Sequence, residues 1–443
     1  MESALLHDVV ARALRTGADA AEAVGAQRQA LSVSVRLGKL EEVEREESSD
    51  LGLRVFVGRR QAVVAGSDLS NAALTRFVER AVAMARLAPE DPYTGLAPED
   101  RLARGALPDL DLYDPTEPSA EALEDAARSA EDAARAVQGV SNSDGGGASW
   151  SSSQWRLVTS AGFDRDHRAS GFGLSASAIA GEGSGMERGG EGRSTRWRAD
   201  LPDAQAIGTE AGRRAVSRLG ARKIDSRTAT VIVDNRVAGG VLSPFVGAIS
   251  GPSVARGASF LKSRLGQAVF GAGVTITDEP LRPRGLGSAP FDDEGVATET
   301  RALVDAGVLT TWLLNTSAAR QLGLTTTGHA ARGLAGAPGV STHNLTLQPG
   351  TETPQALMAA AGEGLLITSM FGPSLNANTG DWSTGVSGFW FERGEPAYPV
   401  NEITVAGNLV DVYARLVPAG DLELRGSTNA PSLFVDGLAI AGR

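Results

Sequence analysis

Hydrophobic and polar residues at the start of the chain change between helical and strand spacing. The pattern predicts a helix over 1–17, strands over 30–37, 51–57 and 61–66, and a helix that begins after Asp68 or Ser70 and ends near Leu87. An acidic segment, 41–50, separates the first two strands. This order of elements predicts a compact, sandwich-like α+β domain over residues 1–88.

Prolines and glycines mark the limits of a second unit. Residues 89–118 contain six prolines among acidic side chains, which predicts a linker because proline interrupts helices and central strands. Ser119 is placed to cap an Ala- and Glu-rich helix. The pattern then predicts that helix to about Val137, a loop over 141–147, strands from 148 to 180, a flexible segment over 181–194 and a helix over about 203–219. We therefore expect a middle α+β domain over 119–222.

The rest of the chain, 223–443, has a different texture. A buried strand is predicted at 228–235, and residues 239–270 alternate between helical and loop character. From Val274 onward, short strands are separated by Gly, Pro and Asn, which is typical of a curled antiparallel sheet or partial barrel. The predicted fold class is α+β: an N-terminal α/β-sandwich-like domain, an α+β middle segment and a mainly antiparallel C-terminal β domain.

Composition and charge exclude several classes of protein. The 443 residues are 42% hydrophobic and 21% charged, which is typical of a folded chain. A formal net charge of −11 gives no overall attraction for DNA, so we expect no direct nucleic-acid partner. The absence of cysteine excludes disulfides, a thiol nucleophile and cysteine-ligated metal. The apolar runs are shorter than the roughly 20 residues that span a bilayer, and the start resembles no signal peptide. We expect a cytoplasmic protein without a membrane partner.

Candidate catalytic groups are few. The chain has four histidines, at positions 7, 167, 329 and 343. None of them begins a zinc-binding H-E-x-x-H or H-E-x-x-x-H pattern, so we predict no metal ligand and no catalytic residue. Ser259 and Lys262 match S-x-x-K, the spacing of a serine nucleophile with a lysine base, but the companion S-D-N and K-T-G motifs are missing. We interpret this segment as an amphipathic helix with Phe260, Leu261 and Leu265 inward and Lys262 in water.

Two glycine- and acid-rich stretches are more distinctive. One joins FDDEG (291–295) to TTTGHAARG (325–333), and the other is NANTGDWSTGVSG (376–388). Adjacent carboxylates suit acid–base chemistry or a cation, and they equally suit an acidic turn at a hairpin. Both interpretations stay open. We expect these stretches to line a cleft that meets substrate or partner, and the candidate residues are Asp292, Asp293, Glu294, Gly295, Thr327, Gly328, His329, Thr379, Gly380, Asp381 and Ser383.

Three long segments resemble the TldD/PmbA family, on its PmbA (TldE) side. Residues 379–442, which begin TGDWSTGVSGFWFERGEPAYP, resemble the family's C-terminal end. Residues 291–333 look like its central signature, and 51–70 (LGLRVFVGRRQAVVAGSDLS) look like its N-terminal domain. The similarity therefore extends over nearly the whole chain.

This resemblance implies a cytoplasmic peptidase of two subunits that degrades or trims unfolded and modified peptides. In that family the TldD subunit carries a zinc-binding H-E-x-x-x-H helix, and its TldE partner lacks it. At the corresponding place this chain reads GVLSPFVGAISGPSVAR (240–256), without His, Glu or Asp. The resemblance thus implies no cofactor on this chain, zinc on a TldD-type partner, and a heterodimer with that partner. A homodimer of the isolated chain is also expected, since closed two-fold pairing is the commonest assembly.

Two other functions stay open. One is a non-enzymatic regulator of DNA gyrase or of another protein, because the family also carries the name of a gyrase modulator. The other is a stand-alone hydrolase that uses Ser259 and Lys262. The three hypotheses differ in what the purified chain does alone: it is inactive without a TldD-type partner, it binds gyrase without turnover, or it cleaves substrates in the presence of chelators.

Overall fold

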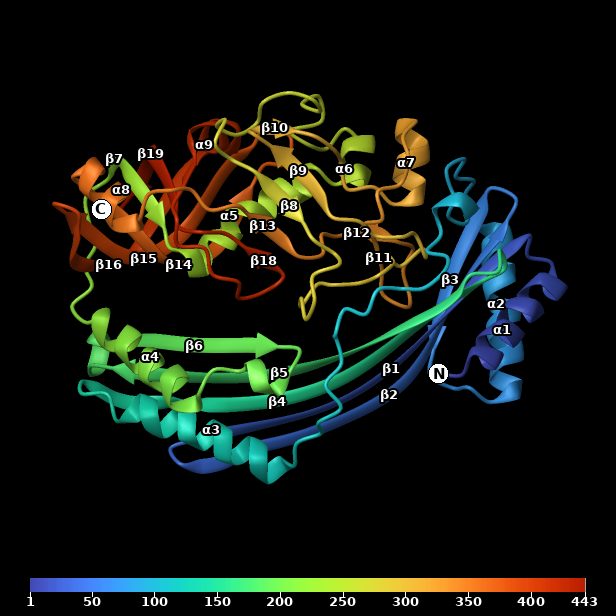
Figure 1. Cartoon of the computed structure of the whole chain (residues 1–443), viewed down its shortest axis with the longest axis horizontal. Coiled ribbons are helices and arrows are strands. Elements are labelled where there is room, and N and C mark those ends of the chain that lie inside the picture. Colours follow the sequence, from blue (N-terminus) through green and yellow to red (C-terminus); the bar gives the residue numbers. More distant parts are fainter. Residues whose placement is uncertain (443) are drawn as a thin grey trace.

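One long antiparallel sheet organises the first part of the chain (Figure 1). In the computed structural model, which describes residues 1–442, its strands follow the order β3-β2-β1-β4-β5-β6. The strands are β1 (Ala20–Arg36), β2 (Lys39–Val57), β3 (Arg60–Gly66), β4 (Val140–Thr159), β5 (Asp164–Ala180) and β6 (Glu187–Thr195). The central strands β1 and β4 pair from Glu22 opposite Thr159 to Val35 opposite Gly146. The predicted units 1–88 and 119–222 therefore share one sheet, in which the backbone groups of β1 and β4 satisfy each other.

Helices cover one face of this sheet. They are α1 (Ser3–Thr16), α2 (Asn71–Leu87), α3 (Ala120–Arg135) and α4 (Ala204–Ser217). Successive side chains of a strand point to opposite faces, and in β1 Ala23 packs with α1 and α2 while Val33 packs with α3 and α4. Val24 points to the other face and packs against the C-terminal part of the chain. The predicted caps are confirmed, since Ser70 and Ser119 accept backbone N–H groups in the first turns of α2 and α3.

The C-terminal part contains a closed barrel. Its strands are β7 (Arg227–Val233), β14 (Glu363–Leu375), β15 (Asp381–Glu392), β16 (Glu395–Asn408) and β19 (Leu433–Ala441), and pairing of β16 with β19 closes the ring. This confirms the predicted curled sheet or partial barrel, with β7–β14 as a parallel pair. The helices α5 (Asn235–Ala248) and α9 (Leu409–Arg415) pack against the barrel, and their buried residues belong to one core with those of the strands.

A smaller sheet lies beside the barrel (Figure 1). Its strands, in spatial order, are β10 (Val308–Leu309), β9 (Arg301–Asp305), β8 (Ile276–Asp278), β13 (Leu345–Leu347) and β18 (Thr428–Asn429). The remaining strands and helices are β11 (Ala330–Ala331), β12 (Gly339–Val340), β17 (Val417–Pro418), α6 (Gly251–Ala255), α7 (Thr316–Leu322), α8 (Pro354–Ala361) and the 3₁₀ turns η1 (Glu99–Arg101), η2 (Gly183–Gly185) and η3 (Arg198–Asp200). Within residues 1–442, no helix combines the length and apolar character needed to cross a membrane.

Three segments that the sequence pattern left outside strands belong to the long sheet. The acidic segment 41–50 lies in β2, the predicted loop 141–147 lies in β4, and most of the predicted flexible segment 181–194 lies in β6. A Cβ at Gly146 would overlap the carbonyl oxygen of Ala127 in α3, and one at Gly189 would overlap the backbone of α4 at Ala215. The glycines are therefore explained by helices that cross the strands closely, and the loop predictions were wrong.

The face opposite the helices is joined to the C-terminal part by buried charges. Glu22 of β1 and Arg54 of β2 are cross-strand neighbours, with Oε1 and Nη1 3.1 Å apart. Arg332 donates to the same Glu22 oxygen at 2.6 Å, and Glu294 lies 3.7 Å from Arg54. Each of these four side chains is at most 3% exposed. Two carboxylates and two guanidinium groups, which we call the joint, thus connect the sheet to two C-terminal loops.

The joint perturbs the acid–base behaviour of its carboxylates. Burial alone would favour the neutral form of Glu22, but the charges of Arg332 and Arg54 outweigh it and hold the pKa of Glu22 below its usual range. Burial raises the pKa of Glu294, against the opposing charge of Arg54. Of the two carboxylates, Glu22 therefore has the stronger electrostatic interaction with the arginines.

We predict that Gly208→Ala destabilises the protein. Gly208 lies where α4 meets α3, and a Cβ there would overlap the carbonyl oxygen of Ala130. Overpacking costs about 1–3 kcal/mol, more than the gain in helix propensity of about 1 kcal/mol. The control is Gly247→Ala in α5, where a Cβ meets open space and helix propensity favours alanine. Denaturant unfolding should show a loss for the first variant and no loss for the second; equal stabilities would contradict the close helix contact.

We also predict that Glu22→Gln destabilises the protein strongly. Removal of one partner from a buried ion pair leaves the other charge uncompensated and typically costs about 3–5 kcal/mol. The matched control is Glu90→Gln, because Glu90 pairs with Arg60 at 3.1 Å but is 63% exposed. Such a surface pair contributes about 0–1 kcal/mol. Thermal and denaturant unfolding of both variants measures the difference, and a Glu22→Gln protein as stable as the control would show that the joint contributes little.

Candidate functional site

The carboxylate of Asp292 accepts hydrogen bonds from nearby backbone N–H groups. Oδ1 accepts the N–H groups of Glu294 and Val296 at 2.9 Å, and Oδ2 accepts the N–H of Ala330 at 3.0 Å. These bonds form a tight turn that also holds the segment around His329 beside it. Burial, together with the negative charge of Glu294, raises the pKa of Asp292 well above its usual range. The Asp292 carboxylate therefore links the loop 291–295 to the loop 325–333 through hydrogen bonds.

The neighbouring carboxylates continue the same connection. Asp293 accepts the backbone N–H of Arg332 at 2.8 Å, and Glu294 accepts the N–H of Thr316 at the start of α7 at 2.8 Å. Burial raises the pKa of Asp293 despite these contacts. Gly295 and Gly328 adopt φ of 83° and 72°, which favours glycine at both turns. The structure thus brings together the loops 291–295 and 325–333 that the sequence singled out.

These residues lie in the interior. Asp292, Glu294, Thr327 and His329 are 3%, 2%, 7% and 2% exposed. Side chains that are buried and bonded to the protein's own backbone do not face a cleft in this conformation, and they stabilise the joint instead. Their role in contacting substrate or partner stays a prediction.

The second candidate stretch lies elsewhere, on the barrel. Thr379 and Gly380 belong to the turn that joins β14 to β15, and Ser383 lies in β15 opposite Ser374. Asp381 is exposed; its carboxylate accepts the Thr379 hydroxyl at 2.7 Å and the side-chain amide of Asn408 at 3.0 Å.

These contacts hold the turn against the start of α9. Asn408 caps that helix, and the carbonyl of Gly380 accepts the N–H of Leu409 at 2.8 Å. The hydrogen bonds from Thr379 and Asn408 lower the pKa of Asp381, which keeps it charged. The exposed side chains of Thr379 and Asp381 remain available to a partner or substrate.

The serine–lysine pair does not form a catalytic dyad. Residues 259–262 form a turn, so the predicted amphipathic helix was wrong. The Ser259 hydroxyl is 1% exposed and donates to the carbonyl of Ala248 at 2.6 Å. The Lys262 ammonium donates to the carbonyl of Gly257 at 3.1 Å. Each polar group has its own backbone partner, and Leu265, predicted to point inward, is 39% exposed.

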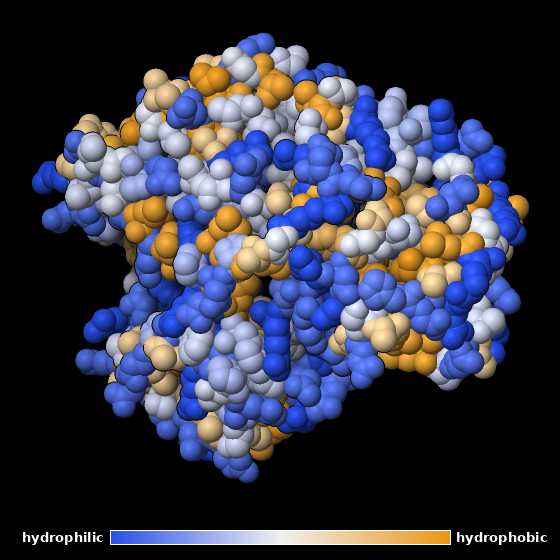
Figure 2. All heavy atoms as spheres, turned by 45° about the vertical axis from the view of Figure 1, so that its right-hand side comes forward, coloured by the Kyte–Doolittle hydropathy of each residue, from blue (hydrophilic) through white to orange (hydrophobic). Residues whose placement is uncertain are grey.

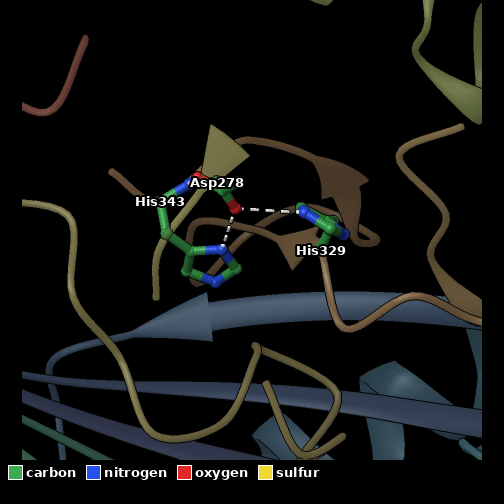
Figure 3. Close-up of side chains that lie close together, drawn as sticks. All are labelled: Asp278, His329 and His343. Carbon is green, nitrogen blue, oxygen red and sulfur yellow. Dashed lines mark hydrogen bonds and ion pairs between the residues drawn. The ribbon is translucent and has the colours of Figure 1, made fainter. Parts of the chain in front are cut away.

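A cluster of Asp278, His329 and His343 was not recognised in the sequence (Figure 3). Oδ2 of Asp278 lies 3.1 Å from Nε2 of His329 and 2.8 Å from Nδ1 of His343. His329 also contacts the Thr327 hydroxyl through Nδ1, at 2.8 Å. Although burial opposes ionisation, hydrogen bonds from the two histidines hold the pKa of Asp278 well below its usual range. Asp278 is 51 residues from His329 and 65 from His343, so no short motif could reveal the cluster.

A groove on the long sheet was also missed. Two adjoining hollows of about 360 and 450 Å³ follow the face opposite α3 and α4. Ser32, Ser149, Gly173 and Ser194 are cross-strand neighbours that line it. The C-terminal part faces this surface from above, and Figure 2 shows the molecule hollowed between the two. The alternation of serine and glycine in these strands was the available signal.

The groove ends at a second set of contacts between the two parts. Arg193 of β6 lies 2.6 Å from Glu423, and Arg425 lies 3.3 Å from Glu191. Arg193 and Arg425 also line the hollow of about 450 Å³. The joint and this polar contact thus hold the C-terminal part against the sheet at two places, with the groove between them.

Family models match almost the entire chain. They are described as PmbA/TldA metallopeptidase domain 1 (residues 21–85), central domain (113–219) and C-terminal domain (226–442). The metalloprotease PmbA of Escherichia coli O157:H7 is 37% identical over 99% of this chain and 96% of its own length. The PmbA homologue of Haemophilus influenzae is 36% identical over 97% of this chain and 94% of its own.

Solved structures share the fold over the full length. A Bacteroides thetaiotaomicron protein described as a candidate modulator of DNA gyrase is 27% identical, with a TM-score of 0.91 over 99% of this chain and 98% of its own. TldE from Thermococcus kodakarensis is 17% identical, with a TM-score of 0.84 over 99% of this chain and 100% of its own. On the strength of the family models and the full-length relatives, this chain belongs to the PmbA/TldD metallopeptidase family.

Proposed function

We propose that this chain is the TldE-type subunit of a two-subunit zinc metallopeptidase in the cytoplasm. It holds no catalytic metal, and a TldD-type partner supplies the zinc. The complex cleaves unfolded or modified peptides, and this chain contributes part of the enclosed substrate cleft. The full-length similarity to proteins named metalloprotease PmbA supports the general activity.

The composition of α5 carries the assignment of a subunit without catalytic metal. The family resemblance places the partner's zinc motif just before a segment that resembles residues 257–270 of this chain. The corresponding residues here are 240–256, which include most of α5. The buried positions of α5 are Ala238, Val241, Leu242, Phe245 and Ala248. Zinc hydrolysis needs about three protein ligands with N, O or S donors, and these side chains have none.

The surroundings of α5 fit packing and do not fit a metal. Phe245 meets Phe270 and Tyr413 edge-on at 5.2 and 6.1 Å between ring centroids. The Tyr413 hydroxyl donates to the carbonyl of Val241 at 3.0 Å. The residues at this place therefore do not fit the catalytic zinc, and we derive no chemical step through it on this chain.

The groove supports a role in peptide binding. Small serine and glycine side chains leave room for an extended chain and demand little of its sequence. The first part of β2, residues 39–50, also has an open edge, because β3 pairs only with 51–57. Extended peptides commonly add a strand to such an edge through main-chain hydrogen bonds. Both features suit unfolded peptides better than a folded substrate.

A second candidate function is the regulation of DNA gyrase. It is favoured by the description of the solved relatives from Bacteroides thetaiotaomicron and Thermotoga maritima, which name a candidate modulator of this enzyme. A regulator would act on gyrase supercoiling without the TldD-type partner and without peptide cleavage.

We predict that the purified chain cleaves no peptide alone and that cleavage begins when a TldD-type protein of the same genome is added. We expect the isolated chain to form a homodimer. Chelators should abolish the activity, and Ser259→Ala should leave it unchanged because that hydroxyl is bonded to Ala248. A peptide-cleavage assay on each protein and on the mixture is the measurement. Chelator-resistant cleavage by the chain alone that is lost in Ser259→Ala would overturn the proposal in favour of a serine hydrolase.

We further predict that Ser149→Trp lowers kcat/KM of the reconstituted pair for peptides by about tenfold or more, because the indole fills the groove and displaces substrate. Ser184→Trp is the control, since Ser184 is an exposed serine in η2. Size-exclusion chromatography shows whether the heterodimer stays intact. Full activity of Ser149→Trp would exclude this groove from the substrate path.

A further inference from the structure

We propose that Asp278, His329 and His343 form a binding site for a divalent transition-metal ion such as Zn²⁺. The site lies on this chain and is separate from the catalytic zinc that we assign to the partner. It departs from the sequence-based expectation that this chain carries no metal, and it does not depend on the proposed peptidase role.

The donor atoms already converge on one place. The ligand atoms of the three residues all lie within 4.8 Å of one another, and Asp278 Oδ2 is 2.8 and 3.1 Å from the two histidine nitrogens. In a tetrahedral zinc site with bonds of about 2.0–2.1 Å, neighbouring donors lie about 3.3 Å apart. Changes of a few tenths of an ångström in the distances from Asp278 Oδ2 to the two histidine nitrogens would match this spacing. The two nitrogens, which lie within 4.8 Å of each other, would need to approach only modestly.

The other polar atoms of two ligands are held by outer contacts. Nδ1 of His329 is 2.8 Å from the Thr327 hydroxyl, which fixes the ring so that Nε2 faces the cluster. Oδ1 of Asp278 accepts the backbone N–H of His343 at 2.9 Å, which leaves Oδ2 toward the nitrogens. Figure 3 shows both rings directed at this oxygen. Outer contacts of this kind orient the ligands of metal sites.

The site is shielded and built from separate segments. The side chains of Asp278, His329 and His343 are 0%, 2% and 10% exposed. Asp278 ends β8, His329 precedes β11, and His343 lies just before β13, which pairs with β8. An ion here would link the loop 325–333, which carries Arg332 of the joint, to the small sheet.

Donor type and nearby charge indicate which ions fit. Two imidazoles and one carboxylate suit Zn²⁺, Co²⁺, Ni²⁺ and Fe²⁺ better than Mg²⁺ or Ca²⁺, which prefer oxygen ligands. Asp293 adds negative charge near His343, and Arg301 adds an opposing positive charge near His329. The alternative is a carboxylate that accepts N–H bonds from both rings and holds no ion, and it uses the same atoms.

The test uses the full chain, stripped with chelator and then dialysed against micromolar free Zn²⁺ or Co²⁺. We expect one ion per chain by elemental analysis, visible absorption bands of Co²⁺ with nitrogen and oxygen ligands, and a higher Tm with metal. His343→Gln and Asp278→Asn should weaken binding by at least about 100-fold. The control is His7→Gln, because His7 is 53% exposed and contacts Asp164 instead.

Circular dichroism of the metal-free variants shows whether each is folded. His343 is the most exposed of the three, so His343→Gln keeps the test valid if Asp278→Asn unfolds. No metal bound by the wild type at micromolar free ion would overturn the site and leave a hydrogen-bonded cluster. Equal metal content in His343→Gln and the wild type would overturn it as well. Because the readout is metal content of the chain alone, its failure leaves the peptidase proposal standing, and failure of peptide cleavage leaves the site standing.

Discussion

Four charges that share a buried space determine how the two parts of this protein fit together. Glu22 and Arg54 are neighbours on adjacent strands, and each needs a partner from the C-terminal part because it is hidden from water. Arg332 and Glu294 supply those partners from loops that are fastened to each other by Asp292. While the two parts stay packed together, loss of any one partner would leave an uncompensated charge in a low-dielectric interior, so the contact favours one arrangement of the two parts. The joint thus fixes one end of the groove.

Local signals in the sequence predicted well the four helices that cover the long sheet. Serine caps at positions 70 and 119 and apolar stripes at helical spacing placed α1 to α4 within a few residues of their observed ends. The strands were predicted less completely, because long-range pairing decides where they end. Residues 41–50 are acidic on both faces and form a strand only because β1 lies beside them. Gly146 interrupts the strand pattern, yet glycine is needed there for the contact with α3.

The site shows the same division between local and distant information. The sequence drew attention to 291–295 and 325–333, and the structure places these loops together. Their side chains are buried, and their main role in this structure is to hold Glu294 and Arg332 of the joint in place. The Asp278–His329–His343 cluster depends on three segments whose distance along the chain hides them from any motif. Its assembly follows from the β8–β13 pairing, in which Asp278 stands opposite Leu345 and so next to His343. The sequence does not predict this pairing, because β8 and β13 have only three residues each.

A subunit can shape catalysis without carrying the reacting metal. The barrel that packs against α5 is closed and filled with apolar side chains, so this part of the chain is a rigid support. The long sheet, in contrast, presents small polar side chains and an open edge, which are the features that hold an extended backbone without selecting its side chains. Because the joint and the Arg193–Glu423 contact hold the groove at both ends, its width is set by the protein and not by the ligand. Under the proposed function, a groove of fixed width would exclude folded domains by size and would favour unfolded chains as substrates.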